Sequence, residues 1–540
     1  MALKIAMLIV FFAVTIYIGY YCRKRAANVD GFVLGGRKVG PWMSAFAYGT
    51  SYFSAVIFIG YAGQFGWKYG ISAFWIGLGN VFIGSLLAWY VLGRRTRVMT
   101  HHLDAKTMPE FFGKRYQSKA LRVVSALIIF VFLIPYTASV YNGLSRLFGM
   151  AFGIPYEACI IGMAVITCIY VVWGGYMATA LNDTVQGSIM LVSIIAIIIC
   201  VLNGQGGFQE SLIALAAIPG PDTASPQMQG VFASMFGPDL ANLLGVVILT
   251  SLGTWGLPQM VQKFYAIESE SSIRKGAIVS TAFALVVAGG SYFLGGFGRL
   301  FGDQIAYTTN AAGVTIPVYD SIIPSMLSTL PDILIGITVI LVLSASMSTL
   351  SSLVLTSSST LTLDVIKAAF KPDMKERGQL FAMRCLLVVF VAISAIIALI
   401  QYNSSVTFIA QLMGISWGAL AGAFIAPFLY GLYWKKTSVA SVWACFAFGV
   451  GLTVSNMFIG FIASPINAGA IAMVGSLIIC PLVSWITPKP SKEDVDEMFS
   501  CYERRVSVPA TDAIDEQEHF IEPIDPAEPR AELERHEARE

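Results

Sequence analysis

The sequence predicts an all-α membrane protein with about 13 transmembrane helices. Its 540 residues are 56% hydrophobic and only 12% charged, and the mean hydropathy is +0.71. Soluble globular proteins contain about 25% charged residues, so the chain falls outside their composition. Apolar runs of about 20 residues, the length that crosses a bilayer core, follow one another along most of the chain.

Thirteen apolar runs are long enough to be transmembrane helices, and polar segments separate each run from the next. In chain order they cover residues 4–22, 42–64, 72–93, 121–149, 156–175, 180–204, 240–262, 276–300, 331–363, 384–402, 404–432, 438–461 and 466–487.

Lysine and arginine are distributed unevenly between the connecting segments. With the N-terminus outside, the inward segments contain 23 basic residues and the outward segments only four, Lys4, Lys68, Arg146 and Arg299. Basic residues concentrate in cytoplasmic loops. We therefore expect an integral protein of the plasma (inner) membrane with its N-terminus outside and its C-terminus in the cytoplasm.

The C-terminal segment differs from the rest of the chain. Residues 488–540 contain 16 acidic and 7 basic side chains, and prolines interrupt them. Such a tail is typical of a disordered segment, here with a short helix near residues 492–504. The eight cysteines lie mostly singly within the predicted helices, which indicates neither disulfides nor a zinc site.

Two interrupted helices divide the spans into groups of five. The segment AYGTSYFSA around residues 48–54 interrupts one helix, and TSLGTWGLPQ, with Pro258, interrupts the other. Backbone groups freed by such breaks cannot face lipid, so they line a cavity or bind a ligand. The expected units are an N-terminal helix and loop (1–41), two repeats (42–204 and 240–432) joined by an outer loop (205–239), two further helices (433–487) and the tail (488–540).

The ninth apolar run is rich in hydroxyl groups. Residues 333–363 carry no charge, yet residues 344–359 read SASMSTLSSLVLTSSS. Ala345, Ser348, Thr349 and Ser352 recur every three or four residues, which places them on one face of a helix. Hard cations prefer oxygen ligands, so this face suits a small dehydrated cation. Hydroxylated residues also permit close helix packing in membranes, and composition alone leaves both interpretations open.

Five segments in order resemble the sodium/solute symporter family, which includes bacterial proline and pantothenate permeases, sodium/sugar cotransporters and monocarboxylate carriers. They are FVLGGRKVGPW (32–42), SYFSAVIFIGYAGQFGWKYG (51–70), GGYMATALNDTVQG (174–187), WGLPQMVQKF (255–264) and SASMSTLSSLVLTSSS (344–359). The resemblance implies a LeuT-type fold of ten core helices in a five-plus-five inverted repeat. It also implies one helix before the core, two after it, and transport by alternating access.

The resemblance implies a first sodium site between the first and eighth core helices. Carried over residue by residue, Thr50, Phe53 and Ala345 would offer main-chain carbonyls to Na⁺, and Ser348 and Thr349 would offer hydroxyls.

Asp183 is the second informative position, because a carboxylate within or at the edge of a membrane span is costly and usually functional. Asp183 and Gln186 have the spacing of a capping box at the start of a helix. Similar symporters instead form a second sodium site from this aspartate and the serines that follow the first site, here Ser348, Ser351 and Ser352. Both interpretations stay open at this point.

The solute signal is weaker. By analogy with the fold, the cavity lies between the two broken helices, and its candidate residues are Tyr52, Ser54, Ile57, Tyr136, Ser251, Thr254, Trp255 and Gln411. Ordinary helix packing explains each of them as well. Tyr52 stands where proline permeases carry an aspartate, and Val56 and Ile57 depart from the sugar pattern. Proline and sugars are therefore both less expected than an organic anion or an amino-acid-like metabolite. Arg146 is the nearest positive group for an anion, and snorkelling to the membrane interface explains it equally well.

These features predict a secondary transporter that couples inward sodium movement to solute uptake, acting as a monomer. The four histidines lie in a loop or in the tail, so the sequence indicates no enzyme, and membrane topology explains the basic clusters without nucleic acid. Two alternatives remain open: a proton-coupled or uncoupled carrier on the same scaffold, and a transporter-like solute sensor.

Overall fold

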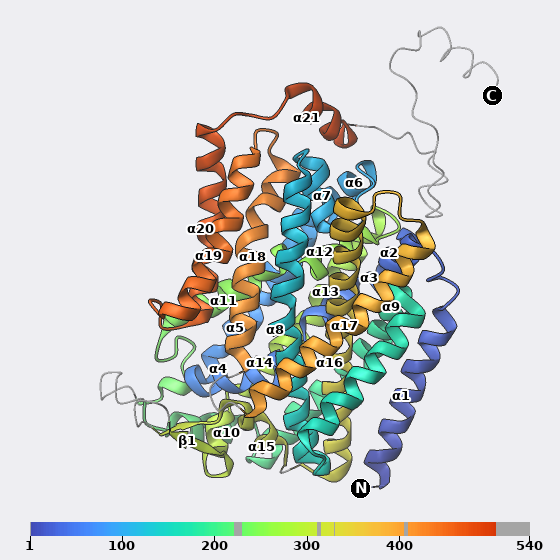
Figure 1. Cartoon of the computed structure of the whole chain (residues 1–540). Coiled ribbons are helices and arrows are strands. Elements are labelled where there is room, and N and C mark those ends of the chain that lie inside the picture. The colour runs from blue at the N-terminus through green and yellow to red at the C-terminus, as the bar shows by residue number, and fades with distance from the viewer. Residues whose placement is uncertain (1, 221–228, 310–314, 329, 404–408, 504–540) are drawn as a thin grey trace, which may run out of the picture.

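The computed structural model of this chain describes residues 2–220, 229–309, 315–328, 330–403 and 409–503, which are almost entirely helical (Figure 1). The first part of the chain forms α1 (Ala2–Cys22), α2 (Val29–Leu34), α3 (Pro41–Tyr52), α4 (Ala62–Tyr69), α5 (Phe74–Gly79), α6 (Arg94–His102), α7 (Met108–Arg115), α8 (Lys119–Phe152), α9 (Tyr156–Gly204) and α10 (Phe208–Ala216). The second part forms α11 (Leu240–Gly256), α12 (Pro258–Tyr265), α13 (Ser271–Ala284), α14 (Gly290–Gly295), α15 (Ile322–Ser328), α16 (Asp332–Thr360), α17 (Glu376–Asn403), α18 (Ile409–Tyr433), α19 (Val439–Ile459), α20 (Pro465–Ile486) and α21 (Lys492–Phe499).

Shorter elements extend or join these helices. The π-helical stretches are η2 (Val56–Tyr61), η4 (Asn80–Leu87), η5 (Trp89–Gly93), η7 (Leu285–Gly289) and η10 (Leu361–Phe370). The 3-10 turns are η1 (Gly35–Arg37), η3 (Gly70–Ala73), η6 (Val231–Ala233), η8 (Gly298–Gln304), η9 (Tyr319–Ser321) and η11 (Ser500–Tyr502). The strands β1 (Tyr307–Thr309) and β2 (Thr315–Pro317) pair antiparallel, with Thr308 opposite Ile316.

Within the described residues, ten helices are long and apolar enough to cross a membrane, and the bent pair of α11 and α12 would make an eleventh. Two of the ten are of double length, with 47 residues in Val56–His102 and 49 in Tyr156–Gly204. A bilayer core needs only about 20 residues, so each of these lengths suits two crossings. The count of thirteen spans stays a prediction.

A single glycine turns the long α9. Gly175 has φ +53° and ψ −149°, a conformation that is rare for residues with a side chain. A Cβ atom at this position would lie 2.9 Å from the carbonyl oxygen of Phe32. The sequence predicts two helices here, 156–175 and 180–204, and in the structure the expected linker is replaced by this one residue.

The first helix of each predicted repeat is broken. After α3, Phe53 is extended, with φ −83° and ψ 112°, and the chain resumes as η2 and α4. Between α11 and α12, Leu257 is extended, with φ −77° and ψ 123°, and the two helices meet at 45°. Pro258 explains the second break, because the residue before proline is disfavoured from helical conformation.

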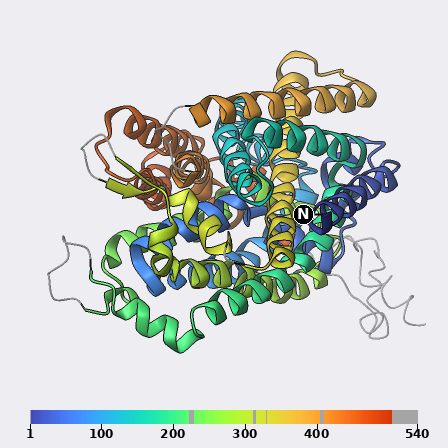
Figure 2. The same cartoon turned by 90° about the horizontal axis from the view of Figure 1, so that it is seen from below.

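Helix α16 lies in the interior of the bundle. Every residue from 338 to 360 is buried, and α16 packs against α1, α3, α8, α9 and α17. Figure 2, seen along the bundle, shows α17 and α1 at the outside of this group. The last long helices, α19 and α20, pack against α18 at the opposite side (Figure 1).

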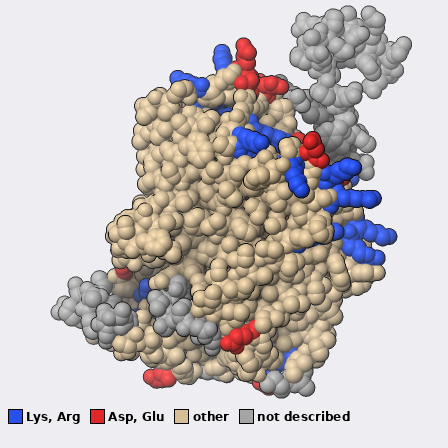
Figure 3. Space-filling model, viewed as in Figure 1, with Lys and Arg blue, Asp and Glu red and all other residues tan. Residues whose placement is uncertain are grey.

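Basic side chains gather at the end of the molecule that carries α6, α7 and α21, opposite the N-terminus (Figures 1 and 3). At this end α21 and η11 fold back onto the bundle. The hydroxyl of Tyr502 donates to the carbonyl of Arg95 at 3.0 Å, and Lys435 pairs with Asp496 at 2.8 Å, which lowers the pKa of the Asp496 carboxyl. The predicted short helix near residues 492–504 is therefore present, and residues 504–540 lie outside the described part.

We expect Gly175→Ala to lower the stability of the protein, because the new Cβ needs both a rare backbone conformation and space held by Phe32. The cost is on the order of 1–3 kcal/mol. The measurement is the apparent melting temperature in detergent. The matched control is Gly162→Ala, in the part of α9 before Gly175, where a Cβ meets nothing within 4 Å. An equal melting temperature for both variants would contradict the prediction.

Candidate ion and solute site

Five oxygen atoms meet between the break after α3 and the middle of α16. The Ser348 Oγ donates to the Thr50 carbonyl at 3.0 Å and lies 3.1 Å from the Ala345 carbonyl. The Thr349 Oγ1 lies 3.4 Å from the carbonyls of both Thr50 and Phe53 and 3.1 Å from that of Ala345. All five residues are buried. The structure thus brings together every residue predicted for the first sodium site.

The break after α3 is what makes these carbonyls accessible to α16. In a continuous helix the Thr50 carbonyl would accept a bond from the amide four residues later. Here it lies within reach of both α16 hydroxyls instead. A hydroxyl oxygen donates and accepts, so it can turn its lone pairs toward a cation when one arrives. None of the five oxygens carries a formal charge, which suits a monovalent ion.

Three other hydroxyls of α16 follow the packing interpretation. Ser358 and Ser359 donate to the Leu355 carbonyl, at 3.2 Å and 2.7 Å, and Thr360 donates to the Thr356 carbonyl at 2.9 Å. Such bonds within one helix satisfy a hydroxyl without a ligand. Helix α16 therefore contains hydroxyls that bond only within their own helix and hydroxyls that also reach α3. The second kind lies beside the break in α3.

Asp183 is not a helix cap, so the capping-box interpretation is wrong. The helical path of α9 is interrupted at Gly175, eight residues earlier, and Asp183 lies inside the helix that follows. Its side chain is fully buried, and neither carboxylate oxygen has a satisfactory hydrogen-bond partner among the described residues. Its ion-pair partner in the described part of the chain is Lys263 of α12, with 3.7 Å between Oδ2 and Nζ.

Lys263 reaches from α12 into the space between Asp183 and α16. Its Nζ donates to the Ser352 Oγ at 3.0 Å, and the Ser352 Oγ lies 3.0 Å from the Ser51 Oγ of α3. The other serine predicted for the second sodium site, Ser351, donates to the Ser348 carbonyl of its own helix at 2.9 Å.

The predicted span ends at residue 262, which puts Lys263 among the 23 basic residues of the inward segments. This placement of Lys263 is wrong. Its side chain is only 2% exposed, because α12 stays inside the bundle as far as Tyr265. Without Lys263, 22 basic residues remain in the inward segments against four in the outward ones, so the expected orientation is unchanged.

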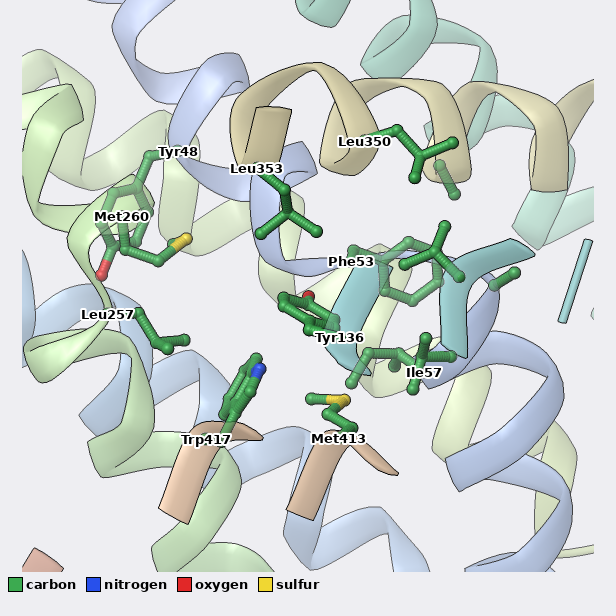
Figure 4. Close-up of a cluster of buried hydrophobic side chains, with 14 of the residues drawn as sticks. Tyr48, Phe53, Ile57, Tyr136, Leu257, Met260, Leu350, Leu353, Met413 and Trp417 are labelled. Atoms are coloured by element: carbon green, nitrogen blue, oxygen red, sulfur yellow. The ribbon is translucent and has the colours of Figure 1, made fainter. Parts of the chain in front are cut away.

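An apolar cluster lies beside the two breaks (Figure 4). It includes Phe53 and Ile57 after the first break, Leu257 and Met260 at the second, Tyr136 of α8, and Met413 and Trp417 of α18. The rings of Tyr136 and Trp417 meet edge to face, with centroids 5.8 Å apart. Of the predicted solute residues, Ile57 and Tyr136 lie in this cluster. Ser54 lies in the first break, where its hydroxyl accepts from the Val56 amide at 3.2 Å.

Three predicted solute residues on α11 instead contact the neighbouring helix η4. Ser251 donates to the Asn80 side chain at 3.4 Å, Thr254 to the Gly84 carbonyl at 3.0 Å, and the Trp255 indole to the Ile83 carbonyl at 2.9 Å. The polar atoms of these three side chains are therefore engaged in helix packing.

Gln411, two residues before Met413 on α18, lines a surface cavity of about 750 Å³ together with Gln64, Lys68, Asp239 and Arg299. The side chains of Tyr52 and Arg146, the remaining solute candidates, lie outside the described part of the structure.

Sequence reasoning missed Gln259, which follows the proline of the second break. The residue is 1% exposed, and neither atom of its side-chain amide has a hydrogen-bond partner among the described residues. A buried amide without partners is costly, which makes this group suitable for binding a polar ligand. The signal was its position in WGLPQ, directly after the residue that breaks the helix.

Asp364 was also missed, because the predicted span ends at residue 363. In the structure η10 continues α16, and the Asp364 side chain is fully buried. One oxygen accepts from Arg122 Nε at 2.6 Å, and the other accepts from Thr107 Oγ1 at 2.6 Å. These bonds tie the continuation of α16 to α8 and to the start of α7.

Broken membrane helices around a group of neutral oxygens are typical of ion-coupled membrane transporters. Residues 32–447 match the family described as "Sodium:solute symporter family". The chain belongs to this family, and it is a sodium-coupled symporter for a small solute.

Its relatives cover nearly the whole chain. It is 26% identical to the osmoregulated proline transporter OpuE of Bacillus subtilis over 493 residues, which are 89% of this chain and 94% of the relative. It is 30% identical to a sodium/proline symporter of Staphylococcus aureus over 512 residues, 92% and 88% of the two chains.

A solved structure has the same LeuT-type fold. It is described as the substrate-bound, outward-open state of a Na⁺-coupled sialic acid symporter, and it covers 91% of this chain and 99% of its own. The TM-score is 0.73 and the identity 17%.

We expect Asp364→Asn to destabilise the protein, because Arg122 loses the charge that it faces. The cost is on the order of 2 kcal/mol, below the 3–5 kcal/mol of a fully buried pair, because Arg122 is 20% exposed and keeps Glu110 at 3.3 Å. The apparent melting temperature in detergent measures it. Asp373→Asn, on an exposed loop, is the control and should change nothing. A melting temperature of Asp364→Asn equal to that of the control would rule out a stabilising pair.

Proposed function

We propose that this sodium symporter carries a small amino-acid-like solute, and that its coupling ion binds to the carbonyls of Thr50, Phe53 and Ala345 and the hydroxyls of Ser348 and Thr349. One observation supports the ion site most directly: the two hydroxyls lie within 3.4 Å of the carbonyls freed by the break after α3. A bound ion would link α3 to α16 across the break and stabilise the arrangement that receives the solute.

A second cation position lies one helical turn away. It comprises Asp183 and the serines Ser348, Ser351 and Ser352. The buried carboxylate supports this assignment, because an ionised group without water requires a positive partner. The number of sodium ions determines the free energy available for transport. One charge that moves through about 100 mV supplies roughly 2.3 kcal/mol, so each further ion increases the driving force on a neutral solute.

The solute occupies the space between the broken helices in this proposal, against Ile57, Tyr136 and Trp417. Ser54 and Gln259 offer it polar contacts, while Ser251, Thr254 and Trp255 hold the second broken helix in place. Gln411 belongs to the solute's access route, and Tyr52 stays a predicted solute contact. An apolar wall suits the aliphatic part of a compact amino acid, whose charged groups need the polar contacts. Two relatives are proline transporters, so proline is the first compound to test although Tyr52 departs from the proline pattern. An organic anion is the second candidate.

The chain acts as a monomer in the plasma membrane, and its two repeats, 42–204 and 240–432, alternate access to the central site. The end with α6, α7 and α21 faces the cytoplasm, because the basic residues gather there (Figure 3). The N-terminus is then outside, and the cavity lined by Gln411 opens outward.

Replacing Ser348 or Thr349 by alanine should raise the sodium concentration that half-saturates uptake by at least about tenfold, because a ligand to a charged group contributes roughly 1.5–3 kcal/mol. The measurement is solute uptake into vesicles containing the purified protein, at varied sodium with choline as the substitute. The control is Ser358→Ala, whose hydroxyl bonds its own helix. Unchanged sodium activation in both site variants would remove these hydroxyls from the ion site.

The solute and the coupling ion are identified by uptake and by mutual stabilisation. Proline should raise the melting temperature in sodium more than in choline, because ion and solute binding are reciprocal. Pantothenate, monocarboxylates and sugars serve as comparison compounds. An imposed sodium gradient should drive uptake where a proton gradient does not. Uptake that follows only the proton gradient would establish the proton-coupled alternative.

A further inference from the structure

The second cation position already lies against a positive group that belongs to the protein. The Lys263 Nζ donates to the Ser352 Oγ at 3.0 Å and lies 3.7 Å from the Asp183 Oδ2, which are two of the groups assigned to a second sodium ion. We propose that the Lys263 ammonium is a tethered cation that takes the place of the second sodium, so that this chain binds one Na⁺. The proposal rests on the proposed function, because it refines the ion count of the same site.

Charge balance supports exclusion of a second ion. Asp183 is 0% exposed and Lys263 2% exposed, so water screens neither group. One carboxylate balances one cation. A sodium ion added beside the ammonium would leave a net positive charge in a dry interior, where an uncompensated ion costs several kcal/mol. Sodium and Lys263 therefore compete for Asp183.

The ammonium also reproduces the structural links that an ion would form. Through Lys263 and Ser352, contacts join four elements: Asp183 of α9, Lys263 of α12, Ser352 of α16 and Ser51 of α3. Ser51 directly follows Thr50, whose carbonyl belongs to the first site. The Nζ also lies 5.0 Å from the ring centroid of Tyr176, a favourable place for a cation. These contacts hold the first broken helix near α16 without a second mobile ion.

The test counts sodium ions bound to purified full-length protein, by equilibrium binding of radioactive sodium in detergent. Wild type should bind one ion per molecule. Lys263→Met removes the charge with little change in side-chain length, frees Asp183, and should bind one ion more. Adding Asp183→Asn to Lys263→Met should return the count to that of wild type. Lys263→Arg, which keeps the positive charge, should match wild type.

The difference between Lys263→Met and wild type decides the proposal. A difference of zero would overturn it, as would two ions on wild type. The first site is judged separately, by the loss of one ion in Ser348→Ala and Thr349→Ala, so its failure is distinguishable from failure of the Lys263 assignment.

Thermal unfolding provides a second readout if Lys263→Met binds ions poorly because it is unstable. Its melting temperature should rise more than that of wild type when sodium replaces choline, and the additional rise should vanish with Asp183→Asn. An equal rise in Lys263→Met and wild type would mean that the ion pair is only structural.

Discussion

The structure depends on one exchange of hydrogen bonds between α3 and α16. When α3 stops at Tyr52, the carbonyls of its last turn lose the amide partners that a continuous helix would give them. Inside a membrane such carbonyls need other partners. Ser348 and Thr349 provide them from a helix nearly 300 residues later in the chain. The same oxygens suit a cation. The contacts that allow α3 to be broken inside the membrane are therefore also the contacts that form the ion site.

The second break works differently, and the contrast separates the two halves of the site. Pro258 imposes a break between α11 and α12 by its covalent structure, whatever lies nearby. The side chains of α11 then fasten it to η4: Ser251 donates to the Asn80 side chain, and Thr254 and Trp255 donate to main-chain carbonyls. The first broken helix is therefore held by contacts that an ion can replace. Helix α11, the first half of the second broken helix, is held by contacts to η4 that lie outside both cation positions. Sodium is expected to act on α3 rather than on α11.

The sequence was informative where local chemistry decides the structure. The hydroxyl face of α16, the break near residues 48–54 and the proline break could all be predicted, because spacing and residue type are sufficient for each. The burial of Lys263 could not be predicted, because a lysine near the end of an apolar run is typical of a membrane boundary. Its burial depends on Asp183, which lies in the other repeat. The contacts of the α11 side chains with η4 could not be predicted for a related reason: hydropathy identifies a buried face but not the neighbour that covers it. Asp364 was missed because its charge ended the predicted span, although Arg122 and Thr107 compensate for it inside the bundle.

The turn at Gly175 has a mechanical consequence. A single residue joins the two arms of α9, and Phe32 closes over it, so the arms have almost no slack between them. They cannot slide past each other or tilt separately without opening that contact. A rocking motion of this half of the bundle that keeps the Phe32 contact therefore swings both arms of α9 together. Asp183, on the second arm, would be displaced along with the hinge and not independently of it.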